Sequence, residues 1–194
     1  MLRSRRSTSP SRHRSTPEAM PRSSSSKGEP PEGPDADPVE VAKHIVLRQL
    51  TASAKSRHQL AQVLQKRGVP PEAAAEALDR FVELGYIDDA AFARSWVESR
   101  QRSRGLSAAA LRRELREKGI DTDLANAVLD EVVTDEGEHA AATALVEKKL
   151  RSMRGVDDAT ATRRLVGMLS RKGYRSGVAF AVVREALTAQ AAAQ

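Results

Sequence analysis

Histidines and adjacent carboxylates are the side chains of this sequence that could bind a metal ion or transfer a proton. The four histidines are isolated, without the i,i+4 partner that would place two ligands on one helix face: His13, His44, His58 and His139. Asp88 and Asp89 are neighbours, but they precede a helical apolar pattern, where a carboxylate caps free N–H groups and stabilises the helix dipole. We therefore expect no metal site, and a helix cap rather than acid–base catalysis.

Other residue patterns that carry chemistry are missing from the sequence. It has no cysteine, which excludes disulfides, thiolate nucleophiles and cysteine-based metal sites. It has no GxxxxGKS/T loop, no GxGxxG after a strand and no nucleophile elbow, so no phosphate-binding loop or hydrolase site is indicated. The sequence predicts a protein that binds a partner without catalysing a reaction, and it implies no cofactor.

Arginine is the residue type best suited to bind a ligand here. Residues 94–118 hold eight basic and three acidic side chains, residues 148–175 hold nine and two, and residues 119–147 hold eight acidic side chains without Lys or Arg. Such blocks favour an extended polyanion or a charged protein as partner. The arginines expected to bind it lie at helix ends or on outer helix faces that recur in two repeats: Arg100, Arg102, Arg104, Arg112, Arg113, Arg116, Arg163, Arg164 and Arg171.

An internal repeat predicts the elements that hold these arginines. Residues 56–69, 107–120 and 161–174 superpose without gaps, with leucines at i and i+4 followed by a basic turn and a glycine, and they lie roughly 50 residues apart. Each copy predicts one helix, and the flanking apolar patterns predict two more. We expect an all-α fold of three tandem three-helix, helix-turn-helix-like repeats in an elongated array, with a compact single bundle as the alternative.

The ends of the expected helices carry cap residues. Ser56 with Gln59 has the form of a capping box, and Ser107 is a cap without one. Glycines that enter the left-handed conformation at little cost are expected to end the repeated helices: Gly68, Gly119 and Gly173. Val82 and most of the six aromatic residues are expected to pack inside the repeats.

The start of the chain differs from the repeats in composition. Residues 1–38 are rich in Ser, Arg and Pro and hold few apolar residues, which predicts a disordered tail rather than a transit peptide. The repeats are expected at residues 39–86, 87–135 and 136–190. No apolar run approaches the roughly 20 residues that span a bilayer, and no signal-peptide apolar region appears, so we expect a soluble, cytoplasmic protein. We also expect it to be a monomer.

One motif resembles a known family. Residues 81–93, FVELGYIDDAAFA, are similar to the signature of the RecX family, which regulates the RecA recombinase. Residues 56–60 and 111–119, with the ending Lys118-Gly119-Ile120, support the resemblance. It covers roughly residues 39–188, while the third repeat is its loosest part and the Ser/Arg-rich tail lies outside it.

The resemblance implies both a fold and a function. It implies that the three tandem repeats form a curved molecule that lies along the groove of the RecA–single-stranded DNA filament. It also implies a negative regulator that inhibits the ATPase, strand-exchange and coprotease activities of RecA in recombination, DNA repair and the SOS response. Two alternatives stay open from the residues alone: a freestanding DNA-binding protein with tandem helix-turn-helix-like units, and a scaffold whose acidic segment recruits a basic partner.

Overall fold

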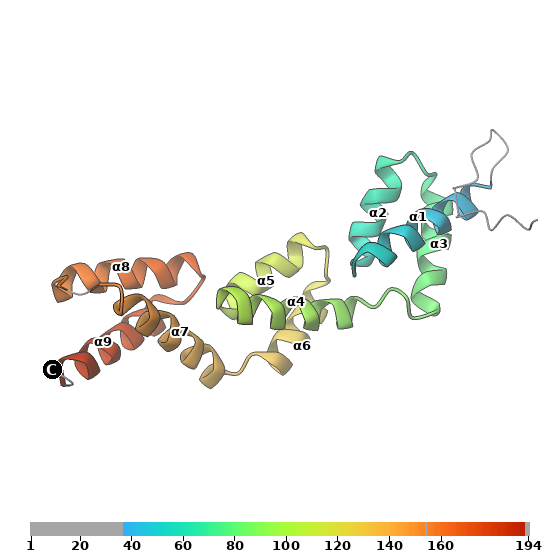
Figure 1. Cartoon of the computed structure of the whole chain (residues 1–194). Coiled ribbons are helices and arrows are strands. Elements are labelled where there is room, and N and C mark those ends of the chain that lie inside the picture. The colour runs from blue at the N-terminus through green and yellow to red at the C-terminus, as the bar shows by residue number, and fades with distance from the viewer. Residues whose placement is uncertain (1–36, 154, 193–194) are drawn as a thin grey trace, which may run out of the picture.

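The structure, a computed structural model, describes residues 37–153 and 155–192 (Figure 1). The regular elements of these residues are all α-helices: α1 (Pro38–Ala52), α2 (Arg57–Lys66), α3 (Pro71–Glu83), α4 (Asp89–Arg104), α5 (Ala108–Glu117), α6 (Thr122–Val132), α7 (Asp135–Leu150), α8 (Asp158–Arg171) and α9 (Ser176–Ala192). The tail expected over residues 1–38 lies outside the described residues, except for its last two. Asp37 caps α1 and Pro38 is the first residue of that helix.

The helices pack in three successive groups of three (Figure 1). We call them unit 1 (α1–α3), unit 2 (α4–α6) and unit 3 (α7–α9), and each unit has its own hydrophobic core. The units follow one another in an elongated array, which confirms the expected repeat fold and excludes the compact bundle. Ile87, in the link between α3 and α4, packs in the core of unit 1, although the second repeat was expected to begin at that residue.

Local sequence signals explain where these helices begin and end. Ser56 and Gln59 form the expected capping box, in which each side chain accepts a hydrogen bond from the backbone N–H of the other. Ser107 caps α5, and Asp88 caps α4 by accepting the Ala91 N–H at 2.8 Å. The three repeated glycines follow their helices with positive φ angles: Gly68 (74°), Gly119 (73°) and Gly173 (89°). The predicted caps and stops are therefore confirmed.

Three large apolar side chains that the sequence left among packing positions lie at the surface. Val82 was expected to face inward, but 43% of it is exposed. Tyr86 and Phe180 are 64% and 56% exposed, so these two of the six aromatic residues are not core residues. Helical spacing locates a face of a helix, but it does not determine how far the neighbouring helices extend over that face.

The second helices of units 1 and 2 meet end to end. The carbonyl of Lys118, at the end of α5, accepts a 2.6 Å hydrogen bond from the Ser56 hydroxyl, at the start of α2. The Arg57 N–H, also at the start of α2, donates to Asp89 Oδ1 of α4 at 2.8 Å. Because the carbonyl end of one helix faces the N–H end of the next, the two helix dipoles attract each other.

The junction between units 2 and 3 repeats this arrangement. The Lys172 carbonyl, at the end of α8, accepts a 3.1 Å hydrogen bond from the Ser107 N–H, at the start of α5. Ser56 and Ser107 are both fully buried by these contacts. The helices α8, α5 and α2 therefore form one end-to-end row along one edge of the array, which Figure 1 shows as the upper edge.

Tyr174 gives the second junction a dependence on pH. Its hydroxyl donates to the Gly105 carbonyl at 3.2 Å, and burial, assisted by the Glu138 carboxylate, raises the pKa of the phenol to about 12. The folded protein therefore holds the Tyr174 proton more tightly than the unfolded chain does. The resulting contribution of Tyr174 to the free energy of unfolding is complete below the ordinary pKa of 10.0, and it is lost as the pH rises through about 12.

We therefore expect a Tyr174→Phe variant to be less sensitive to high pH than the wild type. Between pH 10 and 12, the wild type should lose about 2 kcal/mol more unfolding free energy than the variant, because each pKa unit is worth about 1.36 kcal/mol. Urea unfolding at several pH values measures this difference, and titration of the other basic groups cancels in the comparison. Parallel pH profiles would contradict the assignment.

Candidate basic binding surface

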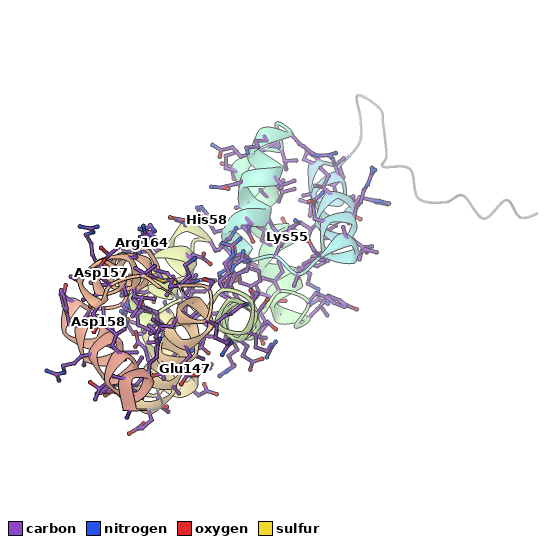
Figure 2. The ribbon with its side chains drawn as sticks, turned by 60° about the vertical axis from the view of Figure 1, so that its left-hand side comes forward. Lys55, His58, Glu147, Asp157, Asp158 and Arg164 are labelled. Atoms are coloured by element: carbon purple, nitrogen blue, oxygen red, sulfur yellow. The ribbon has the colours of Figure 1, made fainter. Side chains whose placement is uncertain are left out.

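The exposed face of the end-to-end row carries a run of arginines. We call this surface the basic row and define it by five exposed side chains: Arg113 and Arg116 of α5, and Arg163, Arg164 and Arg171 of α8. They face outward because the leucines of the same helices are fully buried. Figure 2 shows His58 of α2 and Arg164 of α8 toward one edge of the array and Glu147 of α7 toward the other.

Arg112 differs from its neighbours on α5. Its side chain is half-buried, and its Nε donates a 2.7 Å hydrogen bond to the Asn126 side-chain oxygen of α6. This contact holds α5 against α6, so Arg112 has fewer free donors for a ligand than Arg113 or Arg116. A variant that tests ligand binding should therefore leave Arg112 in place.

The three arginines at the end of α4 have carboxylate partners within unit 2. Arg100 Nε donates to Glu114 Oε2 at 3.0 Å, and Arg104 lies 3.7 Å from the same carboxylate. Arg102 lies 3.5 Å from Glu98 of its own helix. Arg100 is the least exposed of the three, at 25% of its side chain. These pairs reduce the positive charge that the end of α4 presents, relative to the basic row.

Trp96 is part of the same cluster. Its indole N–H donates to Glu114 at 2.8 Å, and the Arg100 guanidinium lies 4.0 Å from the centre of its ring. The Lys118 ammonium lies 4.7 Å from that centre, which adds a second cation–π contact. The sequence did not single out Glu114 or Lys118 for this role, because the contacts join α4 to α5.

The basic row lies on two successive helices, but its arginines do not repeat residue by residue. In the superposed copies, the three α5 arginines align with α8 residues that are not basic: Val166, Gly167 and Ser170. Arg164 aligns with Ala110, which is 6% exposed because Gly173 of unit 3 packs against it. Arg164 is exposed because α8 is the last helix of the row in the described residues. The expectation of equivalent arginines in two repeats is therefore wrong.

A cluster of carboxylates lies on the opposite edge of the array. This edge includes the link between α6 and α7, which runs along the lower edge in Figure 1. Four carboxylates on this link and the adjoining helix ends are exposed: Asp130, Glu131, Asp135 and Glu136. Glu131 pairs with Arg94 at 3.1 Å. The α6–α7 link therefore presents carboxylates on the side of the array opposite the basic row, while Asp157 and Asp158 are exposed at the start of α8 beside that row (Figure 2).

The remaining candidate groups cap helices or contact single side chains, as His58 contacts Gln62 and His139 contacts Glu185. Asp88 caps α4 and Asp89 accepts the Arg57 N–H, so both carboxylates contact backbone donors as a helix cap requires. Within residues 37–153 and 155–192, no group of three or more His, Cys, Asp or Glu side chains could hold a metal ion. No helix in this part of the chain is long and apolar enough to cross a membrane.

Comparison with protein families finds three matches that follow the units. The first three-helix domain of RecX matches residues 42–81, the second matches residues 88–129, and the third matches residues 136–183.

Curated relatives show the same similarity over most of the chain. Regulatory protein RecX of Streptomyces coelicolor is 51% identical over 161 residues, which are 83% of this chain and 83% of that protein. Regulatory protein RecX of Mycobacterium avium is 44% identical over 163 residues, covering 83% of this chain and 93% of the relative. The corresponding protein of Thermobifida fusca is 42% identical over 163 residues, covering 82% and 88%.

Solved structures share the fold at low sequence identity. RecX from Lactobacillus salivarius matches with a TM-score of 0.71 and 19% identity, over 77% of this chain and 97% of that one. A second structure, of a regulatory protein RecX, matches with a TM-score of 0.67 and 23% identity, over 77% of this chain and 72% of that one.

Proposed function

The chain belongs to the RecX family, and we propose that it regulates the RecA recombinase by binding the RecA–single-stranded DNA filament. In this proposal it is a negative regulator that lowers the ATPase, strand-exchange and coprotease activities of RecA. It acts by binding, as a monomer in the cytoplasm, through its three three-helix units.

The basic row is the observation that carries this proposal. Five exposed arginines lie along helices that are joined end to end, so their charges are held on one edge of a long array. A filament presents phosphates and acidic side chains at many successive places along its length, and a row of fixed cations can contact several of them at once. Each phosphate contact releases counterions, so binding should weaken as the salt concentration rises.

The experiment that tests the proposal is a titration of RecA's single-strand-dependent ATP hydrolysis with this protein. We expect hydrolysis to fall as the protein is added. Inhibition far below one molecule per RecA would indicate capping of growing filament ends, whereas inhibition near equal amounts would indicate occupation of the groove.

No effect on hydrolysis at any ratio would contradict the proposal. Tight, strongly salt-dependent binding to duplex DNA without RecA would then support the freestanding DNA-binding alternative. Binding to duplex DNA should therefore be measured alongside, with the same protein preparation.

A further inference from the structure

The turn between α3 and α4 carries the largest concentration of exposed apolar side chains in the described residues. The described residues hold five exposed large hydrophobic side chains. Three of the five lie within five positions of the sequence, at the end of α3 and in the turn that follows it: Val82, Leu84 and Tyr86. They belong to the motif that resembles the RecX signature, yet they contribute little to the core. The other residues of that motif have structural roles, since Phe81 and Ile87 are buried and Asp88 caps α4.

A groove lies beside this turn, between units 1 and 2. It has a volume of about 410 Å³, and its apolar lining includes Val82 and Ile87 from unit 1 and Ala90 and Leu124 from unit 2. We call this hollow, together with Leu84 and Tyr86 of the same turn, the α3–α4 groove.

The backbone holds the turn in one conformation. The N–H groups of Tyr86 and Ile87 both donate to the Phe81 carbonyl, at 2.9 and 3.1 Å, and Gly85 has a positive φ of 73°. The Tyr86 ring also contacts the Phe81 ring, with 5.8 Å between their centres. Exposed apolar side chains on a fixed turn lose little conformational entropy when a partner covers them, which favours binding.

Two carboxylates and one guanidinium line the groove, namely Asp88, Asp89 and Arg57. Arg57 pairs with Asp79, and Arg80 pairs with Glu83 at 3.0 Å. The carboxylates of Asp88 and Asp89 accept backbone N–H groups and have no cationic side chain bonded to them in the described residues. An apolar surface with this rim fits an apolar side chain flanked by Lys or Arg, and it disfavours phosphates.

We propose that the α3–α4 groove docks a protein surface of the filament, namely a RecA segment that presents an apolar side chain beside Lys or Arg. This inference rests on the proposed function. It assigns the basic row and the α3–α4 groove to different parts of the same filament. The basic row meets the phosphates or acidic groups of the filament, and the α3–α4 groove meets a basic, apolar part of RecA.

A Leu84→Ser, Tyr86→Ser variant tests the groove, and Leu47→Ser is its control. Leu84, Tyr86 and Leu47 are 51%, 64% and 53% exposed, so none of the replacements removes a core side chain, and Leu47 lies on α1, away from the α3–α4 turn. Because the Tyr86 ring contacts Phe81, circular dichroism verifies that the double variant is folded. Binding of each fluorescently labelled protein to RecA filaments on single-stranded DNA is measured at several salt concentrations. We expect the double variant to bind about tenfold more weakly, because covering one large apolar side chain contributes at least that much. Its salt dependence should stay that of the wild type.

The outcomes separate this inference from the proposed function. If the wild type binds and inhibits RecA but the double variant binds equally well, the groove assignment is wrong and the proposed function stands. An equal loss in Leu47→Ser, or a changed salt dependence, also overturns the assignment. If the wild type neither binds nor inhibits RecA, the proposed function fails, and the assignment fails with it. If sedimentation shows a self-association that the double variant abolishes, the groove pairs two copies of the chain and the assignment is overturned.

Discussion

Replacing Gly119 by alanine should lower the free energy of unfolding by about 2–4 kcal/mol and open the junction between units 1 and 2. Gly119 has a φ of 73°, and a Cβ at this position would lie 2.1 Å from Cγ and 2.2 Å from Cβ of His58. Those atoms are at the base of the His58 side chain, so a rotamer change cannot move all of them away. The end of α5 would have to move away from the start of α2.

Gly68 provides a matched control for this experiment. Its φ is 74°, nearly that of Gly119, but nothing lies within 4 Å of a Cβ placed there. Gly68→Ala should therefore cost only the left-handed conformation, about 1 kcal/mol. Denaturation followed by circular dichroism measures both variants, and small-angle scattering measures the dimensions of the array. Equal losses in the two variants would show that the end-to-end junction does not form in solution.

Reversing two charges of the basic row, in an Arg113→Glu, Arg116→Glu variant, should weaken filament binding by about tenfold or more at low salt. Both side chains are exposed on α5, and each lost phosphate contact should reduce the slope of log affinity against log salt by roughly 0.7. Binding to RecA filaments over a range of salt concentrations measures both effects, and circular dichroism verifies that the variant is folded.

An Arg48→Glu, Arg184→Glu variant is the charge-matched control. Both arginines are exposed, on α1 and α9, and they lie outside the row of α2, α5 and α8. The net charge changes by the same amount in the two variants, so a long-range effect of net charge alone would weaken both equally. Selective loss in the α5 variant would support the basic row as the contact, and equal losses would sink that assignment.

The helices and their boundaries could be read from the sequence because the forces that set them are local. Leucine spacing, the Ser56 and Asp88 caps and the glycine stops act within one or two helical turns, and the structure confirms each of them. Recurrence of the same pattern three times then predicted the number of units, and the signature at residues 81–93 indicated the family.

The end-to-end row could not be read in the same way. It depends on hydrogen bonds between residues far apart in the chain: Ser56 and Lys118 are 62 positions apart, and Tyr174 and Gly105 are 69 apart. A helix cap and a helix stop each satisfy a local rule, and neither rule says that the stop of one unit will contact the cap of another.

The same limit applies to the candidate surfaces. The sequence identified nine arginines by charge and helical spacing, but only the tertiary structure separates exposed ones, such as Arg113, from Arg100, which is held by Glu114 and Trp96. Likewise, Val82 has the spacing of a core residue, but it is 43% exposed and lines the α3–α4 groove instead of the core. Local chemistry along the chain determined the elements of this protein. Packing between distant segments decided which of their side chains remain free to bind.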